Sequence, residues 1–239
     1  MSMITSPSPE AVQARAVLLG RSNWGAAEIA FWILAVACYW IFPTKLSLLS
    51  EIAILGLVAL SVDLVLGYAG IVTLGQGAFF GIGAYAAGLA AKHGMGTSLW
   101  SDPLIGLFIG GGVAAFIGFA TSFLVLRGSD MTRLMVTLGV ALIVDEVVNQ
   151  MKWLTGGSDG LQGVLPSAVL GIWDFDLFGR VAYVYSLVVL FVLFVIARAL
   201  VKSPFGLSLQ AIKGNQLRTR AIGMPVNARL IAVYTVAAF

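Results

Sequence analysis

Long apolar stretches follow one another along most of the chain, separated by short polar segments. A helix needs about 20 apolar residues to cross the hydrocarbon core of a bilayer, and most of the stretches approach that length. The pattern predicts six transmembrane helices, at about 28–43, 46–66, 68–91, 104–126, 132–151 and 181–201. A seventh begins near Arg229 and reaches only Phe239, so we expect the chain to be truncated at its carboxyl end. The predicted fold class is all-α, a polytopic helical membrane protein.

The polar ends of these stretches predict how the chain is oriented. Residues 1–27 are rich in polar residues, serine and proline, and are typical of a disordered tail and not of a cleaved signal. Residues 28–239 then form one transmembrane domain, with a polar excursion at about 202–227. With the tail in the cytoplasm, ten lysines and arginines fall inside and four outside, as the positive-inside rule requires.

Composition agrees with a lipid environment. Of 239 residues, 59% are hydrophobic and 10% are charged, against about 45–50% and about 25% in soluble domains. The formal charge of +3 comes from basic residues that flank the apolar runs, so the expected surroundings are membrane lipid and no nucleic-acid partner is expected. A single Cys38 excludes an intrachain disulfide, and His93 alone does not make a metal site.

A few polar residues interrupt the apolar helices. Charges near the centre of a membrane helix cost about 2.5–3.5 kcal/mol each, so we expect them to face protein or water. The candidates for lining a permeation path are Asp63, Thr73, Gln76, Asp145 and Glu146. Hydrogen bonding between helices, or a position at the membrane surface, is the alternative for each of them.

Glycine is concentrated between Gly67 and Gly88, in GYAGIVTLGQGAFFGIGAYAAG. Small residues at helical spacing allow the backbones of membrane helices to approach closely. Two such stripes are predicted to pack together: Thr73, Gly77, Gly81, Ala84 and Gly88 on one helix, and Gly106, Gly110, Ala114 and Gly118 on the next. No Lys-Ser/Thr follows the glycines, which argues against a phosphate-binding loop, so no ATP site and no enzymatic activity are expected of this chain.

The excursion at 202–227 has its own pattern. After Pro204, Phe205, Leu209, Ile212, Leu217 and Ala221 recur at roughly helical spacing, and Gly223-Met224-Pro225 ends the run. The spacing predicts one short amphipathic helix. Such a helix could rest in the lipid headgroups or dock into another protein, and its composition leaves both open.

Three separated motifs resemble one known family. GYAGIVTLGQGAFFGIGAYAAG, LTGGSDGL and SPFGLSLQAIKGNQLRTRAIG are similar to the LivM-type permeases of branched-chain amino-acid ABC transporters, from about Ala53 to Phe239. The resemblance implies an inner-membrane importer for leucine, isoleucine and valine. It implies three kinds of protein partner: a LivH-like second permease, two cytoplasmic ATP-binding subunits and a periplasmic binding protein. ATP is bound by those partners, and no cofactor is implied for this chain.

The same resemblance makes the excursion the element that couples the permease to its ATPases. The residues carried over are Phe205, Gly206, Ala211, Ile212, Asn215, Ala221 and Gly223. The sequence departs from the family pattern at Gln216, where an acid is common, and at Asp63, where asparagine is common.

Other functions remain open at the level of sequence. The same architecture could carry urea or short amides. A secondary transporter would use Asp63, Asp145 and Glu146 for proton coupling. A membrane enzyme would need catalytic groups that converge, and one histidine and one cysteine on different helices do not supply them.

Overall fold

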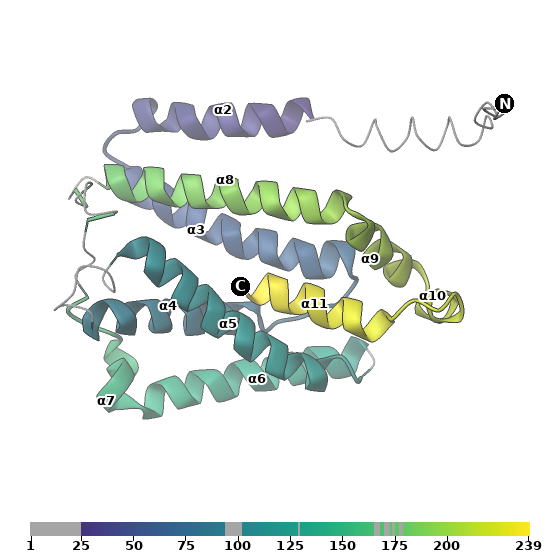
Figure 1. Ribbon diagram of the computed structural model, residues 1–239. Coiled ribbons are helices and arrows are strands. Elements are labelled where there is room, and N and C mark those ends of the chain that lie inside the picture. The colour runs from purple at the N-terminus through teal and green to yellow at the C-terminus, as the bar shows by residue number, and fades with distance from the viewer. Residues whose placement is uncertain are drawn as a thin grey trace, which may run out of the picture. The chain divides into compact units, whose positions relative to one another are not determined.

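The computed structural model describes residues 25–93, 102–128, 130–164, 168–169, 173, 175–176 and 179–239. Most of the predicted tail at 1–27 therefore lies outside the described residues, as do parts of the polar segment at 152–180 and the side chain of His93. The chain divides into two units, Met1–Pro43 and Thr44–Phe239. Figure 1 labels the described α-helices of each unit.

The first unit contributes one described helix, α2 (Ala26–Ile41). It begins two residues before the predicted position, where the Glu28 carboxylate accepts a hydrogen bond from the Gly25 N–H at 3.3 Å. None of its residues is buried, and Leu34 and Trp40 are 61% and 71% exposed. An apolar helix with no buried face is suited to lipid and not to water.

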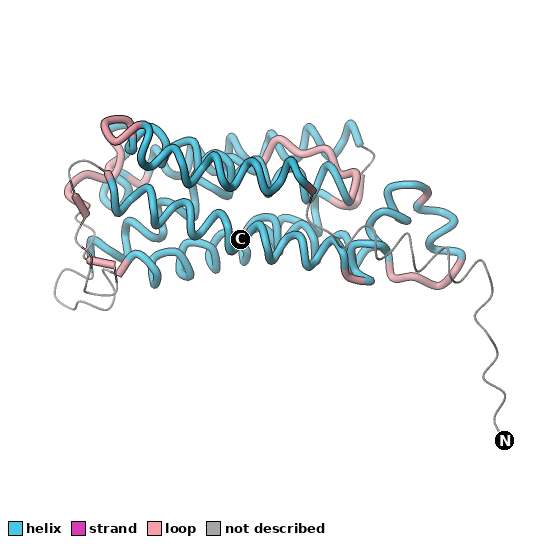
Figure 2. Tube along the Cα trace, turned by 90° about the horizontal axis from the view of Figure 1, so that it is seen from above, coloured by secondary structure: helices cyan, strands magenta, loops and turns pink. Residues whose placement is uncertain are grey.

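The described part of the second unit consists mainly of helices joined by loops (Figure 2). Its helices are α3 (Leu46–Val62), the π-helix η1 (Asp63–Tyr68), α4 (Gln76–His93), α5 (Pro103–Val125), α6 (Asp130–Gln150), the short α7 (Lys152–Thr155) with the 3₁₀ turn η2 (Gly157–Asp159), α8 (Arg180–Lys202), α9 (Pro204–Gly214), α10 (Gln216–Ala221) and α11 (Val226–Ala238). Among the described residues the only β-type pairing is an isolated bridge between Val169 and Trp173.

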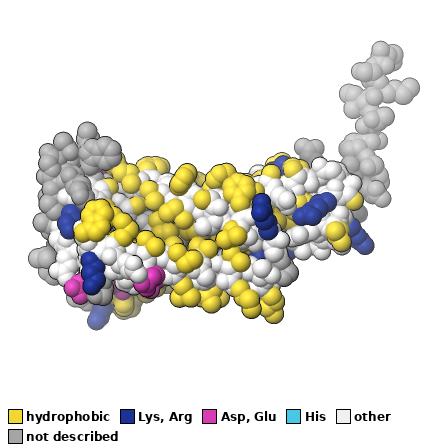
Figure 3. Space-filling model, turned by 90° about the horizontal axis from the view of Figure 1, so that it is seen from below, with side chains coloured by type: hydrophobic (Ala, Val, Ile, Leu, Met, Phe, Trp, Pro, Cys, Tyr) yellow, Lys and Arg dark blue, Asp and Glu magenta, His cyan; other side chains and the backbone are white. Residues whose placement is uncertain are grey.

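Helices thus occupy each of the predicted regions, and the all-α class is confirmed. Three of them are long and apolar enough to cross a membrane by themselves: Leu46–Tyr68, Pro103–Val125 and Arg180–Lys202. α2 and α11 are apolar but shorter. Hydrophobic side chains cover the middle of the face seen in Figure 3, and lysines and arginines lie toward its two ends. This distribution is typical of a membrane-spanning protein.

Close backbone contact joins α4 to α5. A Cβ built on Gly110 would lie 2.6 Å from the Gly83 carbonyl oxygen, and one on Gly83 would lie 3.3 Å from the Gly110 carbonyl oxygen. The contact face of α5 carries a buried residue at nearly every fourth position: Gly106, Gly110, Ala114, Gly118, Ser122 and Val125. Gly118 faces Ala238 of α11, so α5 packs on two neighbours through the same stripe.

The structure differs from the stripe predicted for α4. A Cβ on Gly77 or Gly81 would meet nothing within 4 Å, and Thr73 precedes the helix. Gly83 makes the contact with α5 instead, Ala84 lines a cavity, and a Cβ on Gly88 would lie 2.8 Å from Leu161. The prediction assumed an unbroken helix from residue 68. The helix starts at Gln76 instead, so Thr73 lies outside it and the spacing counted from Thr73 does not mark its contact face.

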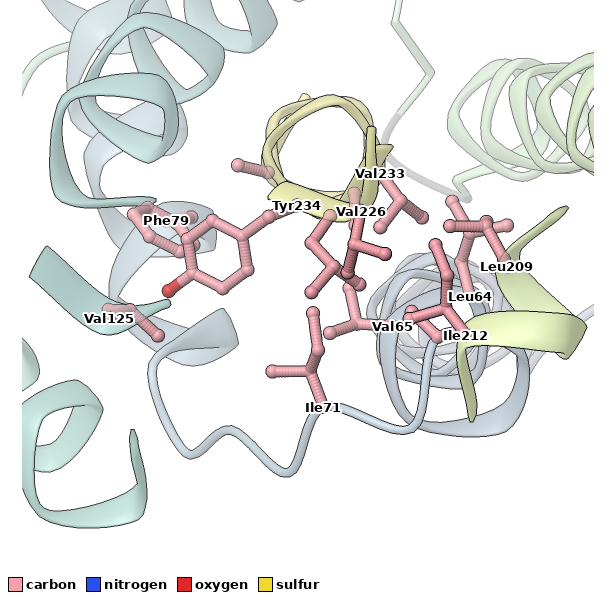
Figure 4. Close-up of a cluster of buried hydrophobic side chains, with 14 of the residues drawn as sticks. Leu64, Val65, Ile71, Phe79, Val125, Leu209, Ile212, Val226, Val233 and Tyr234 are labelled. Atoms are coloured by element: carbon pink, nitrogen blue, oxygen red, sulfur yellow. The ribbon is translucent and has the colours of Figure 1, made fainter. Parts of the chain in front are cut away.

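A buried apolar core lies where η1, α4, α5, α9 and α11 meet (Figure 4). Val65, Ile71, Ile212 and Val233 have no exposed surface. Tyr234 packs edge-to-face on Phe79, with ring centroids 5.7 Å apart and an interplanar angle of 87°, a favourable arrangement for two aromatic rings. This core holds α9 and α11 against η1 and the segment that leads from η1 to α4.

We predict that Gly110→Val separates α4 from α5, because the valine side chain would occupy the position of the Gly83 carbonyl. Overpacking of this kind costs about 1–3 kcal/mol, so the midpoint of thermal unfolding in detergent should fall by several degrees. Gly112→Ala is the matched control, since a Cβ there meets nothing within 4 Å. Equal midpoints for the two variants would contradict this packing.

Candidate functional site

The chain leaves its helical path between η1 and α4. α3 widens into the π-helix at Asp63, the helix ends at Tyr68, and α4 starts only at Gln76. Gly70 has φ of +70°, a conformation that residues with a side chain rarely adopt. The helix predicted at 68–91 is therefore wrong over its first eight positions, from Tyr68 to Gly75, where η1 ends and an irregular segment follows. We call residues 69–75 the break.

Irregular backbone is tolerated inside a membrane protein only where its polar groups are paired within the protein. In the break, the Ile71 N–H donates to the Val65 carbonyl at 3.1 Å. The Leu74 N–H donates to Thr137 Oγ1 at 3.2 Å. The Gly75 N–H donates to Thr73 Oγ1 at 3.1 Å. Two threonine hydroxyls thus replace carbonyls that a continuous helix would have supplied.

Thr73 also connects the break to α11. The hydroxyl of Tyr234 is placed for hydrogen bonds with the side chains of Thr73 and Thr121. Tyr234 is 1% exposed, so water does not replace these partners. The ring and the hydroxyl of Tyr234 together hold α4, α5 and the break around α11.

Gln76 opens α4 and is 5% exposed. Its Oε1 lies 3.2 Å from Ser61 Oγ, which also lies 2.6 Å from the Ala237 carbonyl oxygen. Gln76 Nε2 has no hydrogen-bond partner among the described residues. A hydroxyl carries a single proton, and the shorter contact with Ala237 takes it. In this orientation of the amide, at least one polar atom of Gln76 is therefore left unpaired in a buried place.

Gln76 and Ser61 border a partly open cavity of about 400 Å³ that is lined by α3, η1, α4, α5, α8 and α11. They supply the only polar side chains in its described lining. The other lining residues include Leu57, Phe80, Ala84, Gly106, Leu107, Gly110, Ala114, Leu193 and Phe239. The cavity is therefore an apolar space with one amide and one hydroxyl at its edge.

The predicted path residues do not gather around this cavity. Thr73 lies in the break, where it contacts Tyr234, and only Gln76 borders the cavity. Asp63 is exposed on η1, with its carboxylate against Gly67. Asp145 and Glu146 are exposed on α6, where they accept hydrogen bonds from Asn149 at 3.3 Å and from Gln150 at 2.6 Å. The three carboxylates lie on two separate elements, and within the described residues no three acidic, histidine or cysteine side chains converge.

The excursion after α8 forms two helices, α9 and α10, and not the single amphipathic helix predicted. Asn215 lies between them with an extended backbone, and its side chain caps α10 by accepting from the Arg218 N–H at 3.0 Å. Leu209 and Ile212 are buried in the core, as an amphipathic α9 requires. Leu217 is 78% exposed, and Ala221 is exposed as well, because the cap at Asn215 restarts the helix in a new direction.

Several of the carried-over residues shape this segment. A Cβ on Gly206 would collide with the Val201 backbone, so glycine is required where α8 turns into α9. Gly223 has φ of +83° and ends α10 through two bonds, from Gly223 N–H to the Arg220 carbonyl at 2.9 Å and from Met224 N–H to the Thr219 carbonyl at 3.3 Å. This pair of bonds is a Schellman motif.

The outer surface of the α9–α10 segment is apolar and basic. Leu207, Leu217 and Ile222 are 43%, 78% and 78% exposed. Arg218 and Arg220 are exposed beside them. Sequence reasoning placed Leu217 on a buried face and passed over Leu207 and Ile222. The Asn215 cap signal in GNQLR is the feature that could have shown the helix restarting.

The helical fold, the break and the cavity together define a class of protein. A polytopic helical membrane protein with a helix interrupted beside a cavity has the architecture found at the binding sites of transporters. Comparison with known families then specifies the class: residues 44–239 match the branched-chain amino acid transport system permease component, and the chain belongs to this family. The matched range coincides with the second unit, Thr44–Phe239.

Two curated relatives carry the same description. The high-affinity branched-chain amino acid transport system permease protein LivM of Salmonella typhimurium is 31% identical over 207 residues, which cover 77% of this chain and 47% of the relative. The protein of that name in Escherichia coli is 29% identical over 237 residues, covering 88% and 53%. The chain thus spans about half the length of these relatives. No solved structure matches it.

We predict that Thr73→Val destabilises the break, because it keeps the shape of the side chain but leaves the buried Gly75 N–H without its acceptor and removes one of the two partners of the Tyr234 hydroxyl. An unsatisfied buried donor costs about 1–3 kcal/mol, which lowers the unfolding midpoint in detergent. Thr235→Val is the control, since the one partner of the Thr235 hydroxyl in the described part of the chain is the Ile231 carbonyl of its own helix. A midpoint for Thr73→Val equal to that of the control would show that the bond contributes nothing.

Proposed function

We propose that this chain is a permease subunit of an ABC importer that carries leucine, isoleucine and valine across the bacterial inner membrane. The observation that carries the proposal is the family match over residues 44–239, which takes in the break, the cavity and the α9–α10 segment together. The two relatives are described as branched-chain amino acid permeases, which supports this cargo.

The proposed path passes the break and the cavity beside it. A cavity with mostly apolar lining suits the aliphatic side chain of such a substrate, and the unpaired amide of Gln76 offers one polar contact. Thr73 is proposed to act indirectly on the path, by holding the break in place. The carboxylate of Asp63 is exposed on η1 and those of Asp145 and Glu146 on α6, and no observation favours proton coupling through them.

The proposed partners are a LivH-like permease, two ATP-binding subunits and a periplasmic binding protein. The positive-inside rule supports an orientation with the amino terminus and the α9–α10 segment in the cytoplasm. There the exposed Leu217, Ile222 and Arg218 would face an ATPase, while Leu209 and Ile212 hold the segment on the core. Ala211 and Ala221 are exposed on the same segment and are proposed as further contacts.

Reconstitution tests the proposal. The complete complex, with its partner permease, ATPases and binding protein, is placed in liposomes and offered labelled leucine, urea and acetamide. We expect uptake of leucine that requires ATP on the ATPase side, and no uptake of urea or acetamide. Uptake of urea alone would contradict the amino-acid assignment, and leucine uptake without the ATPases would contradict the ABC mechanism.

A substitution on the exposed surface of α10 tests the proposed contact with the ATPase. Leu217→Asp places a charge on the proposed contact with the ATPase and removes no core contact, because Leu217 is 78% exposed. ATPase retained on the permease during purification should fall severalfold while the permease itself stays folded. Full retention would argue against docking through α10.

A further inference from the structure

One side chain joins the α9–α10 segment to the end of η1. Lys213 of α9 donates from Nζ to the carbonyl oxygen of Gly67 at 2.7 Å, although the two residues are 146 positions apart in the sequence. The Gly67 carbonyl is among the last of η1, and the final carbonyls of a helix have no partner within it. A cation at this end of a helix also interacts favourably with the helix dipole.

The stem of the same lysine lies across the start of the break. A Cβ built on Gly70 would lie 2.9 Å from Lys213 Cγ and 3.4 Å from Lys213 Cβ. Gly70 also has φ of +70°. A residue with a side chain would thus be strained at position 70 and would push the lysine away, so this glycine and Lys213 fit one another.

Apolar packing lies close to the polar contact. Leu209 and Ile212 of α9 lie against Leu64 and Val65 of η1 in the core, as Figure 4 shows. Ile212 and Val65 have no exposed surface. Interiors packed in this way transmit displacement instead of absorbing it. A movement of α9 is therefore passed to η1 through the core, and to the Gly67 carbonyl through Lys213.

The break is the place where such a movement can be absorbed. π-Helical turns occur often at functional sites, and a few terminal residues of an element commonly act as the hinge in a conformational change. Directly after Gly70, Thr73 contacts Tyr234, and Gln76 borders the cavity. A shift at Gly67 and Gly70 would therefore reach the cavity within one short segment.

We propose that Lys213 is a positioning residue for transport, which ties the proposed ATPase-docking segment to the break so that movement of α9 changes the backbone beside the cavity. This inference rests on the proposed function and adds to it the contact through which the two parts communicate. Lys213 touches neither substrate nor ATP in this role. Its contribution is to the coupling between hydrolysis and uptake.

The test compares three substitutions in the reconstituted complex, with ATP hydrolysis and leucine uptake measured together. Lys213→Met keeps most of the stem over Gly70 and removes the ammonium group. Lys213→Gln keeps a polar end that is too short to reach Gly67. Lys213→Arg keeps the charge and the donors. Loss of one hydrogen bond shifts a two-state equilibrium about fivefold, so Met and Gln should raise the ATP consumed per leucine by about that factor.

The arginine variant and a distant lysine make the result specific. Lys213→Arg should stay within about twofold of the wild-type ratio, because it preserves the charge-assisted bond. Lys92→Met removes the same charge from the exposed far end of α4 and should leave the ratio unchanged. The Met and Gln variants should retain their ATPases, since the role lies in coupling and not in assembly.

Four outcomes overturn the inference. A wild-type ratio in both Met and Gln would show that the contact is not used. An arginine variant as defective as methionine would show that the charge does not matter. Loss of the ATPases from the Met and Gln variants would make the role structural. A wild-type complex that takes up no leucine would contradict the proposed function and this inference with it. That outcome differs from the other three because it is seen before any residue is substituted.

Discussion

The pairing of backbone groups across the break is the constraint on which the rest of the second unit depends. Seven residues leave the helical path between Tyr68 and Gln76, and a peptide group without a partner is costly where water is excluded. Thr137 of α6 and Thr73 of the break itself supply the acceptors for Leu74 and Gly75. α6 therefore contributes one of the hydrogen bonds that hold the backbone before α4.

The remaining elements support this arrangement by close packing. α5 brings Gly110 against Gly83 of α4, and its next turns receive Ala238 of α11 at Gly118. Tyr234 then reaches between Phe79 and Thr73. Small residues on α5 permit this proximity, because a larger side chain would hold α11 away from the break.

The prediction from sequence succeeded where one periodicity extends over a whole helix. The apolar runs predicted the positions of α3, α5, α6 and α8 to within a few residues, and the four-residue spacing of small residues marks the face of α5 that is buried. It failed where the backbone departs from a helix. Neither the end of η1 at Tyr68 nor the restart of α10 after Asn215 changes the hydrophobic pattern, so the stripe on α4 and the buried face of α10 were misplaced.

The candidate site was harder to predict for a related reason. Gln76 borders the cavity together with Ser61 and Ala237, which come from other helices. No spacing within GYAGIVTLGQG contains that information. The charged residues were predicted to line a path because a charge is costly in lipid. Asp145 and Glu146 are instead paired with amides four residues along their own helix. The docking role proposed for the α9–α10 segment rests on resemblance, and its contact with Gly67 required three-dimensional structure.

Hydrogen exchange at single-residue resolution, in the wild-type chain in lipid nanodiscs, tests the central claim most directly. The claim is that the break is an ordered segment held by hydrogen bonds to side chains. It predicts that the Leu74 and Gly75 amides exchange orders of magnitude more slowly than the same residues in an unstructured peptide of the same sequence. Exchange of both amides at the rate of that peptide would contradict the account.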